Sequence, residues 1–110
     1  MSAEELSTIV IDLGVKRKGR LTESYLTSFG AVVGNALERV LAGMDLNNLK
    51  IKGSPQEIQT FLATFGAEKK HLEYLMNPGY GDPRTDATAK KVLQAAVDFE
   101  RITGLKWPLK

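Results

Sequence analysis

The sequence predicts an α+β domain that is mostly helical, with three main helices and two short strands. Two runs, at residues 8–13 and 49–52, have the length and pattern of strands. Three longer stretches carry apolar side chains at intervals of three and four residues, which is typical of amphipathic helices. The 110 residues, 43% hydrophobic and 25% charged, fit one globular unit. We divide it into an N-terminal strand and basic arm, residues 1–21, and a single helical domain with a short strand, residues 22–110.

The first strand is expected at Thr8–Leu13, because this run is rich in β-branched side chains and Gly14 closes it. The second is expected at residues 49–52, where apolar and cationic side chains alternate before Gly53. A ribbon of two isolated strands is only marginally stable in water. The strands are therefore expected to be stabilised by the helices of this chain or by pairing onto another chain, and the sequence leaves both alternatives open.

The first helix is expected to begin after Thr22, a suitable N-cap, with Glu23 in its first turn. Its apolar face consists of Leu26, Phe29, Val33, Leu37, Val40, Leu41 and Met44. Gly30 and Gly34 lie one turn apart in this helix, where each glycine costs roughly 1 kcal/mol relative to alanine. This cost indicates that another segment packs closely there.

The second helix is expected to begin at Pro55, because Ser54, Pro55 and Glu57 form a capping box with proline at the first helical position. We expect one bent helix that runs through Gly66. A loop follows at residues 77–83, where asparagine, proline, glycine and aspartate, which favour turns, predominate.

The third helix is expected to start between Asp82 and Asp86 and to end at a left-handed Gly104. Its inward face is expected to contain Ala89, Val92, Leu93, Ala96, Val97, Phe99 and Ile102. After Gly104 reverses the chain, Leu105 is expected to pack on Phe99, and Trp107 to be at least half buried.

Composition argues against several functions. Fifteen Lys and Arg against 13 Asp and Glu leave a charge of +2, which points to no particular partner. The absence of cysteine and the single histidine, His71, leave no thiol chemistry and few metal ligands. We expect His71 to be a helix-surface residue. The sequence shows no catalytic motif, so we expect no enzyme activity, no cofactor and no metal. No run is long and apolar enough to span a bilayer, and no secretory signal precedes the domain, so no membrane partner is expected.

Lys16, Arg17, Lys18 and Arg20 lie in a loop with glycines at positions 14 and 19. The spacing resembles a phosphate-binding loop, but Arg20 and Leu21 replace the lysine and the hydroxyl that such a loop needs. We therefore expect an exposed, mobile loop that is either simply solvated or makes a weak contact with an anion or nucleic acid. No aromatic side chain interleaves the cations, which argues against base stacking.

Large aromatic side chains near a loop tip or chain end anchor either the domain itself or a partner. Tyr80 and Trp107 occupy such positions. The candidate interface residues are Ile9, Ile11, Gly30, Gly34, Tyr80 and Trp107.

The C-terminal segment Phe99-Glu100-Arg101-x-Thr103-Gly104-x-Lys106-Trp107-Pro108, preceded by Gly81-Asp82-Pro83-Arg84-Thr85, resembles the ends of small uncharacterised proteins encoded beside virion genes of tailed bacteriophages. The resemblance extends to Lys52-Gly53-Ser54 and Glu68-Lys69-Lys70. It implies a non-enzymatic structural or assembly protein, found in the virion or host cytoplasm, whose partners are itself or other virion proteins. The alternative is a small regulatory or nucleic-acid-binding module that uses residues 16–20.

Overall fold

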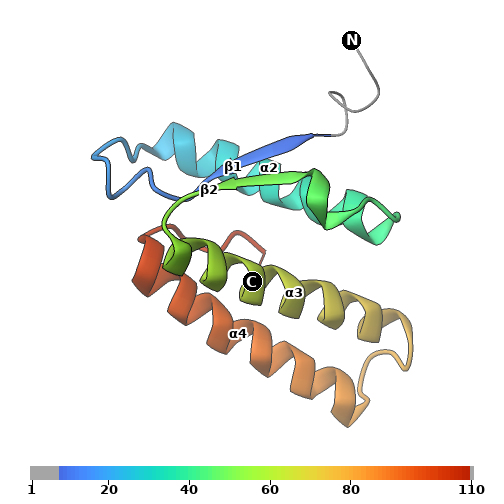
Figure 1. Ribbon diagram of the computed structural model, residues 1–110. Helices are drawn as coiled ribbons and strands as arrows, with labels where there is room; N and C mark the ends of the chain where they lie inside the picture. Colours follow the sequence, from blue (N-terminus) through green and yellow to red (C-terminus); the bar gives the residue numbers. More distant parts are fainter. Residues whose placement is uncertain (1–7, 110) are drawn as a thin grey trace.

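The computed structural model describes residues 8–109. Within them the elements follow in the order β1 (Ile9–Asp12), α2 (Glu23–Leu41), a 3-10 turn η1 (Leu46–Asn48), β2 (Leu49–Lys52), α3 (Pro55–Met76) and α4 (Pro83–Thr103), as shown in Figure 1. This confirms the mostly helical α+β fold. None of the helices in the described part of the chain is long and apolar enough to cross a membrane.

The two strands pair with each other, in parallel, from Ile9 opposite Leu49 to Asp12 opposite Lys52. Helix α2 makes the crossover between them, as a parallel pair requires. Ile9 and Ile11 point into the core, whereas Val10 between them is half exposed. The described part of residues 1–21 is therefore packed together with the rest of the domain and is not a separate arm.

The core lies where the β1–α2–β2 layer meets the antiparallel pair of α3 and α4 (Figure 1). At its centre the Trp107 ring stands edge-on to Phe99, with 5.2 Å between ring centroids, and tilted against Phe61 at 5.9 Å. The C-terminal tail thus fills the space between the layers. Pro108 then approaches Gly30 of α2, where a Cβ atom would lie 3.3 Å from the Pro108 Cβ.

The local signals for the helix ends are confirmed. The Thr22 side chain accepts a hydrogen bond from the Tyr25 N–H, and Ser54 and Glu57 form the capping box at the start of α3. Helix α3 continues through Gly66 without a break. Helix α4 ends at Gly104, whose φ of 75° is the left-handed conformation that glycine adopts without strain.

The expected inward face of α4 is wrong at two positions, because Leu93 and Val97 are 55% and 62% exposed. Threonines take part of the buried face instead. The residues of α4 that are buried are Thr85, Thr88, Val92, Ala96, Phe99 and Thr103. The small side chains of the threonines let α3 and α4 pack closely. Each threonine hydroxyl donates to a carbonyl oxygen; that of Thr103, for example, donates to the Phe99 oxygen at 2.7 Å.

Candidate functional site

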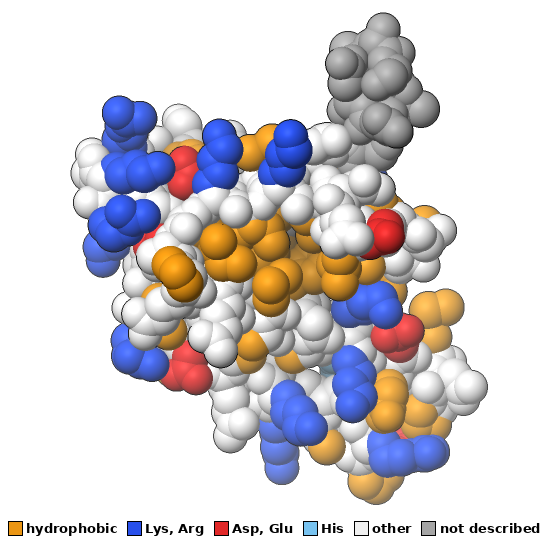
Figure 2. Space-filling view, viewed as in Figure 1, with side chains coloured by type: hydrophobic (Ala, Val, Ile, Leu, Met, Phe, Trp, Pro, Cys, Tyr) orange, Lys and Arg blue, Asp and Glu red, His pale blue; other side chains and the backbone are white. Residues whose placement is uncertain are grey.

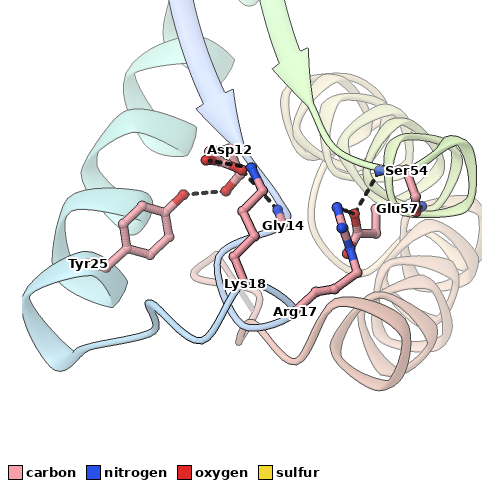
Figure 3. Close-up of polar contacts among 7 residues, drawn as sticks. All are labelled: Asp12, Gly14, Arg17, Lys18, Tyr25, Ser54 and Glu57. Carbon is pink, nitrogen blue, oxygen red and sulfur yellow. Dashed lines mark hydrogen bonds and ion pairs between the residues drawn. The ribbon is translucent and has the colours of Figure 1, made fainter.

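Residues 14–20 form a turn that side chains of two other elements hold from two sides, Asp12 of β1 and Glu57 of α3 (Figure 3). On one side Arg17 extends toward the start of α3, where its Nη2 donates to Glu57 Oε1 at 3.3 Å. The same carboxylate oxygen accepts the Ser54 N–H at 2.7 Å. Burial alone would raise the pKa of Glu57, but the hydrogen bonds from Ser54 and Arg17 and the charge of Arg17 outweigh it, so that the pKa is lowered. Glu57 is therefore an ionised anchor for the turn.

On the other side the turn is tied to the end of β1. Asp12 accepts the Gly14 N–H at 2.9 Å, and its second carboxylate oxygen lies 3.8 Å from Lys18 Nζ (Figure 3). The Tyr25 hydroxyl donates to the Asp12 backbone oxygen, and burial together with the Asp12 charge raises the pKa of Tyr25. The side chain of Val15 is buried beneath the turn. The cationic side chains are exposed as expected, but their backbone is anchored, which the glycine-bounded sequence did not indicate.

Lys50 and Lys52 bring further positive charge to the same side of the molecule. They lie two residues apart on β2, so they share the outer face of the sheet, and both are exposed. Asp12, which Lys18 contacts, pairs in register with Lys52. Figure 2 shows the resulting band of cations along the upper and upper-left edge of the molecule. We call it the basic surface, and it consists of Lys16, Arg17, Lys18, Arg20, Lys50 and Lys52.

A separate pocket of about 220 Å³ holds a buried carboxylate. Glu68, only 4% exposed, accepts the indole N–H of Trp107 at 3.2 Å. Burial raises the pKa of Glu68, against the smaller opposing effects of that hydrogen bond and of His71 one turn away. His71 is partly buried, and its Nδ1 lies 2.9 Å from Thr88 Oγ1, so the expected helix-surface histidine is in part an interhelical contact. Residues 8–109 contain no group of three or more potential metal ligands.

The raised pKa of Glu68 predicts how stability changes with pH. The folded protein keeps this proton to a higher pH than the unfolded chain, so stability falls as pH rises through the ordinary carboxyl range to the folded pKa. Glu68→Gln keeps an acceptor for the indole and removes the charge. We expect this substitution to stabilise the protein at neutral pH by on the order of 1 kcal/mol. In acid, where Glu68 is already protonated, it should change the free energy of unfolding little. Urea titrations at several pH values measure this, with exposed Glu73→Gln as the control; a destabilised Glu68→Gln at neutral pH would contradict it.

Two apolar surfaces among the described residues are candidates for contact with a partner. The first is the apolar hollow that Figure 2 shows between β2 and α3, which we call the apolar cleft. We assign to it Ile51 of β2 and Ile58 and Leu62, which lie one turn apart on α3. Ile51 and Ile58 are partly buried against the core, and Leu62 is 43% exposed. The second, which we call the apolar ridge, consists of Leu93 and Val97 on the outer side of α4. These two side chains lie one turn apart and so project from the helix together.

The structure separates the candidate interface residues into three groups. Ile9, Ile11 and Trp107 are buried in this chain's own core, so their side chains do not face a partner. Gly30 is covered by Pro108 of the same chain, whereas no atom of another segment within residues 8–109 lies within 4 Å of a Cβ built on Gly34. Tyr80 is 94% exposed.

Sequence reasoning did not identify the lysines of β2 or the residues of the apolar cleft as functional candidates, and it placed Leu93 and Val97 on the buried face of α4. The alternation of apolar and cationic residues at 49–52 indicated that the lysines share one face of the strand. Their position beside the turn at residues 14–20 depends on the parallel register of β1 and β2, which the sequence did not indicate. Comparison of the chain with protein-family models, curated protein sequences and solved structures gave no significant match.

Proposed function

We propose that this protein is a non-enzymatic structural or assembly protein of a bacteriophage virion, and that it acts by binding further copies of itself. The virion role rests on the resemblance of the C-terminal segment and the short motifs near residues 52–54 and 68–70. The mode of action rests on Leu62 of the apolar cleft and on Leu93 and Val97 of the apolar ridge, which the folded chain leaves exposed to water.

The two apolar surfaces have complementary shapes. The ridge is convex, because Leu93 and Val97 project from one helix, and the cleft is a hollow between a strand and a helix (Figure 2). An apolar helix face that enters an apolar groove is a common mode of protein recognition. We therefore place the ridge of one copy in the cleft of the next, where both surfaces lose their contact with water.

Such a contact joins two different surfaces, so a pair of bound copies still offers one free cleft, on one copy, and one free ridge, on the other. Contacts of this kind build closed rings when the rotation between copies closes, and filaments when it does not. Either product suits a structural component that is present in many copies. The observation that carries the proposal is that one chain exposes both halves of the contact.

The proposal predicts self-association that depends on the ridge. Val97→Asp places a charge where the ridge would be buried, so we expect it to abolish self-association and to leave the fold intact, because residue 97 is exposed in the monomer. Sedimentation velocity at increasing protein concentration measures the loss. Met76→Asp, at an exposed apolar position at the end of α3, is the matched control and should associate like the native protein. Mass spectrometry of purified particles tests the virion role separately. A native protein that stays monomeric and is absent from particles would contradict the proposal.

A further inference from the structure

The basic surface is unusual for a chain whose net charge is only +2. Six cations come from two segments, residues 16–20 and 50–52, that lie far apart in the sequence and are joined by the sheet. The acidic side chains in contact with them are Asp12, which is partly exposed, and Glu57, which is buried. Positive charge is therefore concentrated here and offset by acidic residues elsewhere on the molecule.

Most of these cations are available to bind an anion. Glu57 engages Arg17, and Asp12 lies at the outer limit of an ion pair with Lys18. Among residues 8–109, neither Lys16, Arg20, Lys50 nor Lys52 has an acidic partner. A surface cation without a partner loses little when it approaches an anion, since no existing contact must break.

The scaffold fixes where this charge lies. The Arg20 N–H donates to the Val15 carbonyl at 2.9 Å and the Lys18 N–H to the Gly14 carbonyl at 3.0 Å, so the turn is closed by its own backbone. The stem of Lys16 lies over Gly104, where a Cβ atom would clash with the Lys16 Cδ. Only long, flexible side chains therefore need to be ordered on binding, which lowers the entropic cost.

The chemistry of the surface favours a phosphate backbone over bases. Stacking on bases requires exposed aromatic rings, and Tyr25, the aromatic residue beside Asp12, is engaged through its hydroxyl and is partly buried. Repeated cations on a fixed face suit a polyanion with regularly spaced charges, and each neutralised phosphate releases about one counterion. We infer that the basic surface, the loop and β2 together, binds the phosphate backbone of nucleic acid without base-sequence preference.

The test uses a pair of charge-matched variants of the full chain. Lys50→Gln with Lys52→Gln removes two charges from the basic surface, and Lys90→Gln with Lys91→Gln removes two exposed charges from α4. The probe is a fluorescently labelled DNA duplex, and its Kd is measured by anisotropy over a series of salt concentrations. We expect the β2 variant to weaken binding at least tenfold near 0.1 M salt and to lower the salt slope by about two, because two phosphate contacts are lost. The α4 variant should bind like the native protein.

Three results would overturn the inference. One is the absence of salt-dependent binding by the native protein, and another is equal weakening by the β2 and α4 variants. The third is binding of an oligoglutamate as tightly as the duplex at the same salt, which would assign the surface to an acidic protein segment. The inference is independent of self-association: Val97→Asp should still bind DNA as a monomer, so the two proposals can fail separately.

Discussion

Replacing Trp107 with alanine is expected to destabilise the fold by roughly 3–5 kcal/mol, the usual cost of deleting a large buried aromatic side chain. The indole is 2% exposed and is packed between rings of both α3 and α4. The indole N–H donates to Glu68, and the backbone N–H of Trp107 donates to the Glu100 carboxylate at 2.9 Å. Deletion would leave a cavity at the junction of the layers and a buried carboxylate without its donor. Both effects reduce the stability of the folded state.

Chemical denaturation followed by circular dichroism measures this effect without relying on tryptophan fluorescence. Lys106→Ala, at the exposed neighbouring position, is the control and should change stability by no more than about 0.5 kcal/mol. A chain truncated after Thr103 should be destabilised at least as much as Trp107→Ala, since it also lacks Leu105. An unchanged denaturation midpoint in both variants would show that the tail is not part of the core.

The second large effect is expected at Glu57. Glu57→Ala removes the acceptor that caps the start of α3 and the anchor of the basic turn, at a cost of about 2 kcal/mol. Most of this cost comes from the partly buried Ser54 contact, because Arg17 is half exposed and its ion pair is screened by solvent. Glu73→Ala, which breaks an exposed ion pair with Lys69, is the control and should cost only a few tenths of a kcal/mol.

The pKa of Glu57 gives this prediction a pH dependence opposite to that of Glu68. Because folding lowers the pKa of Glu57, its contribution is fully present above the unfolded carboxyl pKa and is lost as pH falls through the folded value. The difference in urea midpoint between native protein and Glu57→Ala should therefore be largest near neutral pH and shrink in acid. A difference that does not change with pH would contradict the assignment of Glu57 as an ionised anchor.

The helices could be predicted from the sequence because their signals are local. The capping box at residues 54–57 and the left-handed Gly104 act within one or two turns, and both are confirmed. The pairing of the strands is a tertiary property. Nothing in the two short runs indicated whether they pair with each other, so the parallel register of Asp12 with Lys52 came only from the structure.

The apolar ridge shows why one face of α4 was assigned wrongly. A hydropathy scale treats threonine as polar and leucine and valine as apolar. The face of α4 expected to be buried therefore included Leu93 and Val97 and left out the threonines. In the folded chain, close packing of α3 on α4 favours small side chains, and threonine hydroxyls bond to nearby carbonyls. Leu93 and Val97 are consequently left outside, where their exposure becomes a reason to expect a partner.

The most direct measurement of the central claim is sedimentation of an equimolar mixture of Leu62→Asp and Val97→Asp. The first variant blocks the apolar cleft and keeps an intact ridge, whereas the second blocks the ridge and keeps an intact cleft. Each variant alone should be monomeric, and the mixture should form a one-to-one heterodimer and nothing larger, because it contains a single pair of intact surfaces. A mixture that remains monomeric, or single variants that associate like the native protein, would contradict assembly through the ridge and the cleft.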